Sequence, residues 1–160
     1  MTTTTTPPGT ALITGASSGI GRDLAACFAA DGWNLVLAAR GVAAMEALAA
    51  DLARRHGITA TVIGADLAAP GGARELHAEI RRRGIAIDAL VANAGSGTYG
   101  DVRDGDLDKD VAMIRLNTIS VVELTRLFLD ELVARRGRIL VTASTAAFPP
   151  CPHMTIYAAT

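Results

Sequence analysis

Residues 10–21, TALITGASSGIG, constrain the fold of this chain more than any other segment. They begin with a short apolar run that predicts a buried strand. Three glycines follow, Gly15, Gly19 and Gly21, and the chain then continues into a predicted helix. A backbone without Cβ atoms lets an anion approach closely, and the free N–H groups at a helix N-terminus attract it. The segment therefore predicts a strand, a glycine turn and a helix that together cradle a phosphate.

The helix predicted after this turn has one apolar face. Ile20, Leu24, Cys27 and Phe28 recur along it at i, i+4, i+7 and i+8. We expect this face to pack against the protein interior, with Cys27 as a small buried hydrophobic residue within it.

The spacing of the glycines, G-x-x-x-G-x-G, differs from the commoner dinucleotide-binding pattern G-x-G-x-x-G. A P-loop is excluded, because no Gly-Lys-Ser/Thr ends the turn. Glycines at these intervals also occur in ordinary turns. The rest of the chain therefore has to decide between a nucleotide site and a simple turn.

Apolar strands and helical segments alternate along the rest of the 160-residue chain, and this alternation predicts βαβ units in one parallel sheet. The expected strands cover residues 34–39, 60–65, 88–92 and 138–143. The expected helices cover residues 42–56, 70–83 and 108–134. We therefore predict one doubly wound α/β domain over residues 10–160.

The helix expected over residues 108–134 has apolar residues around much of its circumference. They are Val111, Ile114, Val121, Val122, Leu124, Phe128, Leu129 and Leu132. A helix of this kind is expected to be buried on more than one side. A large core and a subunit interface both fit that expectation.

The composition excludes several classes of partner. Of the residues, 50% are apolar and 19% are charged, which is enough for a hydrophobic core. The net charge of −1 offers no general attraction for nucleic acid or for an anionic membrane. No run approaches the roughly 20 apolar residues of a membrane span. We expect neither nucleic acid nor a membrane as a partner.

The cysteines, the histidines and the N-terminal segment lead to three further expectations. Cys27 and Cys151 lie far apart and form no C-x-x-C pair, which fits a reducing cytoplasm. The three histidines have no metal-ligand spacing among themselves, so no metal site is expected. Residues 1–9, MTTTTTPPG, lack the basic and apolar regions of a signal peptide, and we expect a disordered leader there.

Small or polar residues follow each predicted strand, at the edge where a sheet of this class binds its ligand. Arg40 ends the second strand, near the place where NAD-binding proteins have a carboxylate for the ribose 2′-hydroxyl. A guanidinium would instead pair with a 2′-phosphate, so Arg40 favours NADP over NAD. The competing interpretation is a solvated arginine in a turn.

Two further candidates follow the third and fourth strands. Asp66 either accepts a hydrogen bond from an adenine amino group or caps the next loop, and its spacing does not separate these roles. Asn93-Ala94-Gly95 lets a backbone pass close to a cofactor. As an isolated turn it would carry little information.

Ser144 follows the fifth strand, and Tyr157 lies thirteen residues later, beyond a proline-rich loop. A tyrosine donates its proton to a carbonyl only if its pKa falls from about 10 toward the working pH, which needs a nearby cation. The competing interpretation is an amphipathic tyrosine at the surface.

Together these motifs resemble the short-chain dehydrogenase/reductase family. The family pattern is present in order and at familiar intervals, in TGASSGIG, Asp66-Leu67, Asn93-Ala94-Gly95, Asn117, Ser144 and Tyr157. The resemblance covers residues 10–160. It implies a Rossmann fold with strand order 3-2-1-4-5 and an NADP-dependent oxidoreductase that interconverts an alcohol and a ketone or aldehyde.

The resemblance also implies roles for individual residues. Ser144 would orient the substrate carbonyl, Tyr157 would transfer the proton, and Asn117 would hold a water in a proton relay. Besides Arg40, the cofactor would contact Gly15, Ser17, Ser18, Gly19, Ile20, Gly21, Asp66, Leu67, Asn93 and Gly95. The family commonly pairs its long helix between subunits, so a homodimer or homotetramer is expected.

One departure concerns the family's Tyr-x-x-x-Lys motif. Its lysine would follow Thr160, and Lys109, the only lysine in the sequence, lies far away in the chain. The family's last two strands have no counterpart either, so we expect the N-terminal part of a longer reductase, inactive by itself. The competing hypothesis is a non-catalytic domain that senses NADP(H), which the absent lysine favours and the retained Ser144 and Tyr157 oppose.

Overall fold

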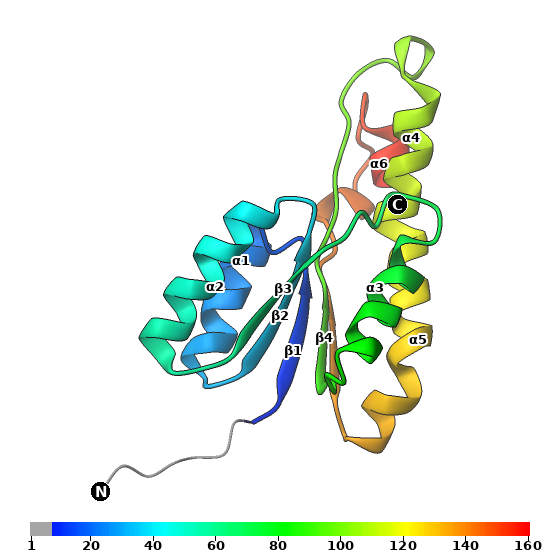
Figure 1. Cartoon of the computed structure of the whole chain (residues 1–160). Helices are drawn as coiled ribbons and strands as arrows, with labels where there is room; N and C mark the ends of the chain where they lie inside the picture. Colours follow the sequence, from blue (N-terminus) through cyan, green and yellow to red (C-terminus); the bar gives the residue numbers. More distant parts are fainter. Residues whose placement is uncertain (1–7) are drawn as a thin grey trace, which may run out of the picture.

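The computed structural model describes residues 8–160. A five-stranded parallel sheet lies at its centre, in the order β3-β2-β1-β4-β5 (Figure 1). The strands are β1 (Thr10–Thr14), β2 (Asn34–Ala39), β3 (Ala60–Gly64), β4 (Ala89–Ala92) and β5 (Arg138–Val141). The expected doubly wound α/β fold and its strand order are confirmed.

Helices cover both faces of the sheet, and each layer has its own hydrophobic core (Figure 1). One layer consists of α1 (Gly19–Ala30) and α2 (Val42–His56), and the other of α3 (Gly72–Arg82) and α5 (Ser120–Ala134). In β1, Ala11 and Ile13 pack into the first core and Leu12 into the second. Strands buried on both faces are continuously apolar, which is why short hydrophobic runs predicted them.

The remaining helical segments lie near the carboxyl ends of the strands, the upper side in Figure 1. They are η1 (Val102–Asp104), α4 (Leu107–Ile114), the π-helical turn η2 (Arg115–Ile119), η3 (Thr145–Ala147) and α6 (Thr155–Ala158). The short helix α6 packs against α4, although the two are separated by the whole of α5 and β5 in the sequence (Figure 1).

The structure corrects the face on which α1 packs. Ile20 is 61% exposed and Cys27 is also exposed, whereas the buried residues of α1 are Gly21, Ala25 and Ala29. These small side chains let the helix axis approach the sheet closely. Leu24 and Phe28 are partly buried and pack at the margin of the first core, while Ile20 and Cys27 are turned toward solvent. The expectation of a buried Cys27 was therefore wrong.

The long helix is also different from the expectation. It is built from α4, η2 and α5, and the π-helical turn interrupts the regular hydrogen-bond pattern at residues 115–119. Only one side of α5 is buried within residues 8–160, through Leu124, Phe128 and Leu132. On another side, Val122 and Val133 are 58% and 69% exposed. The core of residues 8–160 thus covers one side of α5, and burial of another side in a subunit interface stays a prediction.

Two element boundaries differ by two residues from the expected ones, for local reasons. The helix expected from Pro70 begins at Gly72, because Gly71 has the left-handed φ of 83° that an α-helix does not contain. The strand expected to reach residue 143 ends at Val141, where its partner β4 ends at Ala92.

The leader expected over residues 1–9 lies mostly outside the described residues, which begin at Pro8. Within the described part, Gly9 is already tied to the sheet, because its carbonyl oxygen accepts the Asn34 N–H over 3.0 Å.

Candidate functional site

A cavity of about 960 Å³ opens at the carboxyl ends of the strands. The turns after β1, β2, β3, β4 and β5 all contribute to its wall, together with η2 and α6. All fourteen candidate residues line it: Gly15, Ser17, Ser18, Gly19, Ile20, Gly21, Arg40, Asp66, Leu67, Asn93, Gly95, Asn117, Ser144 and Tyr157. The fold thus brings together residues that are up to 142 positions apart in the sequence (157 − 15).

Two of the three glycines are required by packing inside the protein. Gly15 has a left-handed φ of 68°, and a Cβ there would lie 2.9 Å from the Ala94 Cα atom. A Cβ on Gly21 would collide with the carbonyl oxygen of Gly15 and lie 2.6 Å from Asn93 Nδ2. Any larger residue at either position would force the β1–α1 turn away from β4.

Gly19 is different, because it faces the open cavity. It has a φ of 52°, and no atom lies within 4 Å of the place where its Cβ would stand. Gly19 is the first residue of α1, and the N-cap residue Ser18 makes no side-chain hydrogen bond to the helix. The N–H groups of the first turn are thus available to an anion, and the helix dipole favours negative charge there.

The two candidates that follow β2 and β3 stand beside this turn. Arg40 is exposed, and none of the ion pairs formed within residues 8–160 involves it. Its neighbour Gly41 lies against Ser17, since a Cβ on Gly41 would be 3.2 Å from that of Ser17. Asp66 Oδ1 accepts the Ala68 N–H over 3.0 Å, so this carboxylate caps its loop with one oxygen.

Thr14, which follows the first apolar run with the glycine turn, and Thr142, to which the sequence assigned no role, are both structural parts of the site. The Thr14 hydroxyl oxygen accepts the N–H groups of Asn93 and Ala94, each over 3.0 Å. The Thr142 hydroxyl donates to Asn93 Oδ1 over 3.1 Å. In the sequence, the one feature that could have indicated these structural roles is a hydroxyl residue directly at the end of each apolar strand.

Asn117 lies in the π-helical turn, and its side-chain amide makes three hydrogen bonds. Its Oδ1 accepts the Ser96 N–H over 3.0 Å, and its Nδ2 donates to the Ser96 carbonyl oxygen over 2.8 Å and to Thr160 Oγ1 over 2.9 Å. Asn117 therefore ties the loop after β4 to the end of α6. A role for its side chain in holding a water remains a prediction.

Ser144 and Tyr157 reach the cavity from the segment after β5. Ser144 is the N-cap of η3, and its Oγ accepts the Ala146 N–H over 3.2 Å. The Ser144 O–H remains available as a donor to a bound ligand. Tyr157 lies in α6 with its ring against Gly97. Lys109 does not line the cavity and pairs with Asp106 over 3.5 Å at the start of α4.

Two features are absent from residues 8–160. No group of three or more His, Cys, Asp or Glu side chains is placed to hold a metal ion. No helix in this part of the chain combines the length and the apolar character that crossing a bilayer requires.

The sheet has the strand order of a Rossmann-type nucleotide-binding domain. A glycine turn and a helix N-terminus also lie at the carboxyl end of β1, as this class of domain requires. Residues 9–160 match the family model described as short chain dehydrogenase. The chain belongs to the short-chain dehydrogenase/reductase family, whose members are oxidoreductases.

Individual relatives agree with this assignment. The chain is 36% identical over 152 residues to dehydrogenase/reductase SDR family member 7B of Mus musculus, an alignment that covers 92% of this chain and 47% of the relative. It superimposes with a TM-score of 0.88 on an alcohol dehydrogenase of Thermococcus sibiricus complexed with 5-hydroxy-NADP, at 31% identity, covering 94% of this chain and 64% of that one.

A second solved structure is equally similar. L-sorbose reductase of Gluconobacter frateurii, complexed with NADPH and L-sorbose, has a TM-score of 0.88 at 31% identity, with 96% of this chain and 59% of that one covered. The present chain spans about half the length of the curated relatives it matches.

Proposed function

We propose that the protein is an NADP-dependent oxidoreductase that interconverts an alcohol and a ketone or aldehyde. The observation that carries this proposal is that Ser144 and Tyr157 line the same cavity as the glycine turn. A proton donor and a carbonyl-binding hydroxyl thus stand beside a nucleotide site, as carbonyl reduction with a dinucleotide cofactor requires.

The residues of the cavity fit a dinucleotide phosphate. The open position over Gly19 and the uncapped first turn of α1 suit a pyrophosphate. Arg40 offers a guanidinium without a carboxylate partner within the described chain, which suits a 2′-phosphate better than a free ribose hydroxyl. Both solved relatives described above hold NADPH or 5-hydroxy-NADP, which supports NADP(H) as the cofactor.

The chemistry assigned to the chain's own residues is proton transfer and orientation of the substrate. NADPH, when bound, supplies the hydride. The free O–H of Ser144 donates a hydrogen bond to the substrate carbonyl oxygen and orients it, while its Oγ is held by the Ala146 N–H. Tyr157 donates the proton to that oxygen as the alcohol forms, and accepts it in the reverse direction. Asn117 holds the loop and helix that frame the tyrosine.

Assembly and location form part of the same proposal. The exposed apolar side of α5 supports a homodimer or homotetramer, because an exposed patch of this kind marks an interaction surface. A cytoplasmic location is supported by Cys27 and Cys151, which are both free thiols, as in a reducing compartment.

The test combines cofactor titration with a turnover assay. NADPH and NADH are titrated into the protein by calorimetry, and NADPH oxidation is followed at 340 nm with a panel of ketones and aldehydes. The assay is run on residues 1–160 and on a chain that continues through the family's lysine. Turnover in either form supports the enzyme. NADPH binding without turnover in both would favour a domain that senses NADP(H).

A further inference from the structure

Three strands end at one side-chain amide. The Asn93 Nδ2 donates to the Thr14 carbonyl oxygen over 3.0 Å, at the end of β1. Its Oδ1 accepts from the Thr142 hydroxyl over 3.1 Å, directly after β5. Asn93 itself follows β4, and its N–H donates to Thr14 Oγ1. We call Thr14, Asn93 and Thr142 the strand-end cluster.

The Asn93 amide occupies the space that two glycines of the nucleotide-binding turn leave free. A Cβ on Gly15 would lie 3.0 Å from Asn93 Nδ2, and a Cβ on Gly21 would lie 2.6 Å from it. The turn therefore packs directly on this amide at Gly15 and Gly21. A rotation of the Asn93 side chain would remove that support.

Thr142 holds the oxygen end of the amide, whose orientation is set by Thr14. The carbonyl oxygen of Thr14 requires a donor, so the NH₂ group of Asn93 must face β1 and its Oδ1 must face β5. The Thr142 hydroxyl completes this arrangement by donating to Oδ1. Thr142 is itself fixed, because its N–H donates to the Ala92 carbonyl oxygen over 3.0 Å. It lies two residues before Ser144, so it connects the substrate-binding strand to the cofactor turn.

We propose that Thr142 is a positioning residue for the nucleotide-binding turn. It holds Asn93, and Asn93 in turn holds the segment from Gly15 to Gly21 in register with Ser144. Cofactor affinity therefore depends on a hydroxyl at position 142. The inference rests on the proposed function only in taking this turn as the NADPH site.

The test compares Thr142→Val, which removes the hydroxyl at nearly constant volume, with Thr142→Ser, which restores it. Thr61→Val on β3 is the matched control, because the Thr61 hydroxyl makes no side-chain hydrogen bond within the described residues. Hydrogen exchange is measured in the cofactor-free proteins, and NADPH affinity by titration.

In Thr142→Val, we expect hydrogen exchange to accelerate in residues 14–21 and 93–94 but not in α2. We expect NADPH affinity to fall about fivefold, which is the effect of losing one hydrogen bond. Thr142→Ser and Thr61→Val are expected to behave as the wild type. Unchanged exchange in the turn, or an equal increase throughout the chain, would overturn the inference. If the wild type binds no NADPH, the proposed function fails, while the exchange measurement still decides whether Thr142 holds the turn.

Discussion

The ring of Tyr157 lies directly on Gly97. A Cβ on Gly97 would come within 3.2 Å of the ring carbon Cδ2 and 3.3 Å of Cγ, which is closer than a side chain packs without displacement of its neighbour. Gly97 follows Ser96, and Asn117 holds the backbone of Ser96 at both its N–H and its carbonyl group. The position of the candidate proton donor is thus set by a loop sixty residues earlier in the chain (157 − 97).

A side chain at position 97 should therefore displace the tyrosine. In a chain that continues through the family's lysine, we expect Gly97→Val to lower kcat for ketone reduction about 10²-fold, the order expected for a misplacement of about 1 Å. Ser96→Ala is the control, because its contacts with Asn117 use the backbone alone. A Gly97→Val protein with the kcat of the wild type would show that the tyrosine is not seated by this glycine.

Removal of the proposed proton donor should separate chemistry from binding. We expect Tyr157→Phe to abolish most turnover while NADPH affinity stays within about twofold, because the ring and its packing remain. Ser144→Ala should lower kcat roughly 10²-fold through the loss of one hydrogen bond to the carbonyl oxygen. Both are measured as NADPH oxidation at saturating ketone. Undiminished kcat in Tyr157→Phe would refute the assignment.

The choice of cofactor should depend on Arg40. We expect the wild type to bind NADPH at least about tenfold more tightly than NADH, which corresponds to about 1.4 kcal/mol. Arg40→Asp should reverse this order, because a carboxylate repels a 2′-phosphate and accepts from a ribose hydroxyl. Arg103→Asp, an exposed change outside the cavity, controls for the altered net charge. Equal affinities for the two cofactors in the wild type, by calorimetry, would contradict the prediction.

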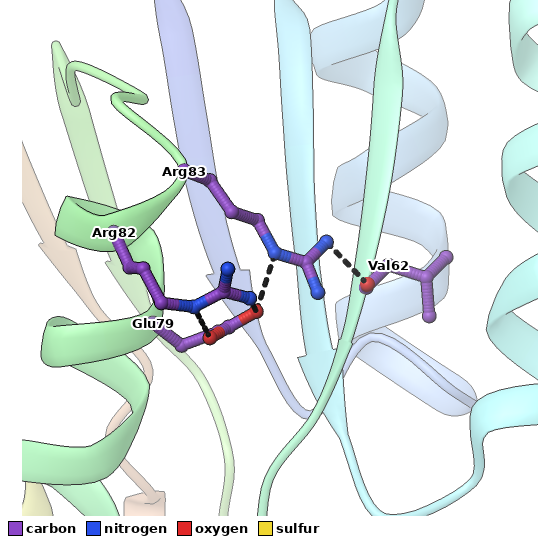
Figure 2. Close-up of polar contacts among 4 residues, drawn as sticks. All are labelled: Val62, Glu79, Arg82 and Arg83. Atoms are coloured by element: carbon purple, nitrogen blue, oxygen red, sulfur yellow. Dashed lines mark hydrogen bonds and ion pairs between the residues drawn. The ribbon is translucent and has the colours of Figure 1, made fainter.

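Glu79 joins α3 to the outer edge of the sheet (Figure 2). It accepts two hydrogen bonds from Arg82, over 2.7 and 2.9 Å, and one from Arg83 Nε over 2.6 Å. Arg83 also reaches the carbonyl oxygen of Val62 on the edge strand β3, over 3.5 Å. The hydrogen bonds from Arg82 and then Arg83 lower the pKa of Glu79 to about 2.

This ion-pair cluster should make stability depend on pH in acid. Because the pKa of Glu79 is lower in the folded chain than the ordinary value of 4.5, its stabilising effect is present above pH 4.5 and is lost as the pH falls toward 2. We expect Glu79→Gln to lower the urea midpoint slightly at pH 7, as for an exposed pair, and the difference from the wild type to vanish near pH 2. Glu46→Gln on α2 is the exposed control. A difference that is the same at both pH values would contradict this account.

The exposed side of α5 leads to a prediction about assembly. Because Val122 and Val133 are mostly exposed, we expect wild-type protein to sediment as a dimer or larger at micromolar concentration. Val122→Glu should shift it toward the monomer, since a charge in an apolar interface is costly. Ala50→Glu, on α2 in the other helix layer, should have no effect. A monomeric wild type would exclude this surface as an interface of the chain by itself.

The sequence alone determined the fold class and the order of the elements, and it predicted which residues gather at the cavity. Each of these follows from local pattern: apolar runs for the buried strands, amphipathic spacing for the helices, and polar or small residues at the strand ends. Since the carboxyl ends of parallel strands meet at one edge of a sheet, candidates such as Arg40, Asp66, Asn93 and Ser144 had to gather there.

Only the tertiary structure decided how these residues support one another. The bond from Asn93 to Thr14 spans 79 positions, and that from Thr142 to Asn93 spans 49, distances over which no local pattern carries information. The buried side of α1 was decided in the same way: small residues face the sheet because the helix must come close to Gly15, which hydrophobicity alone cannot indicate. Local sequence sets each element's conformation, but the close approach of elements depends on side-chain volumes and hydrogen bonds that exist only after they have packed.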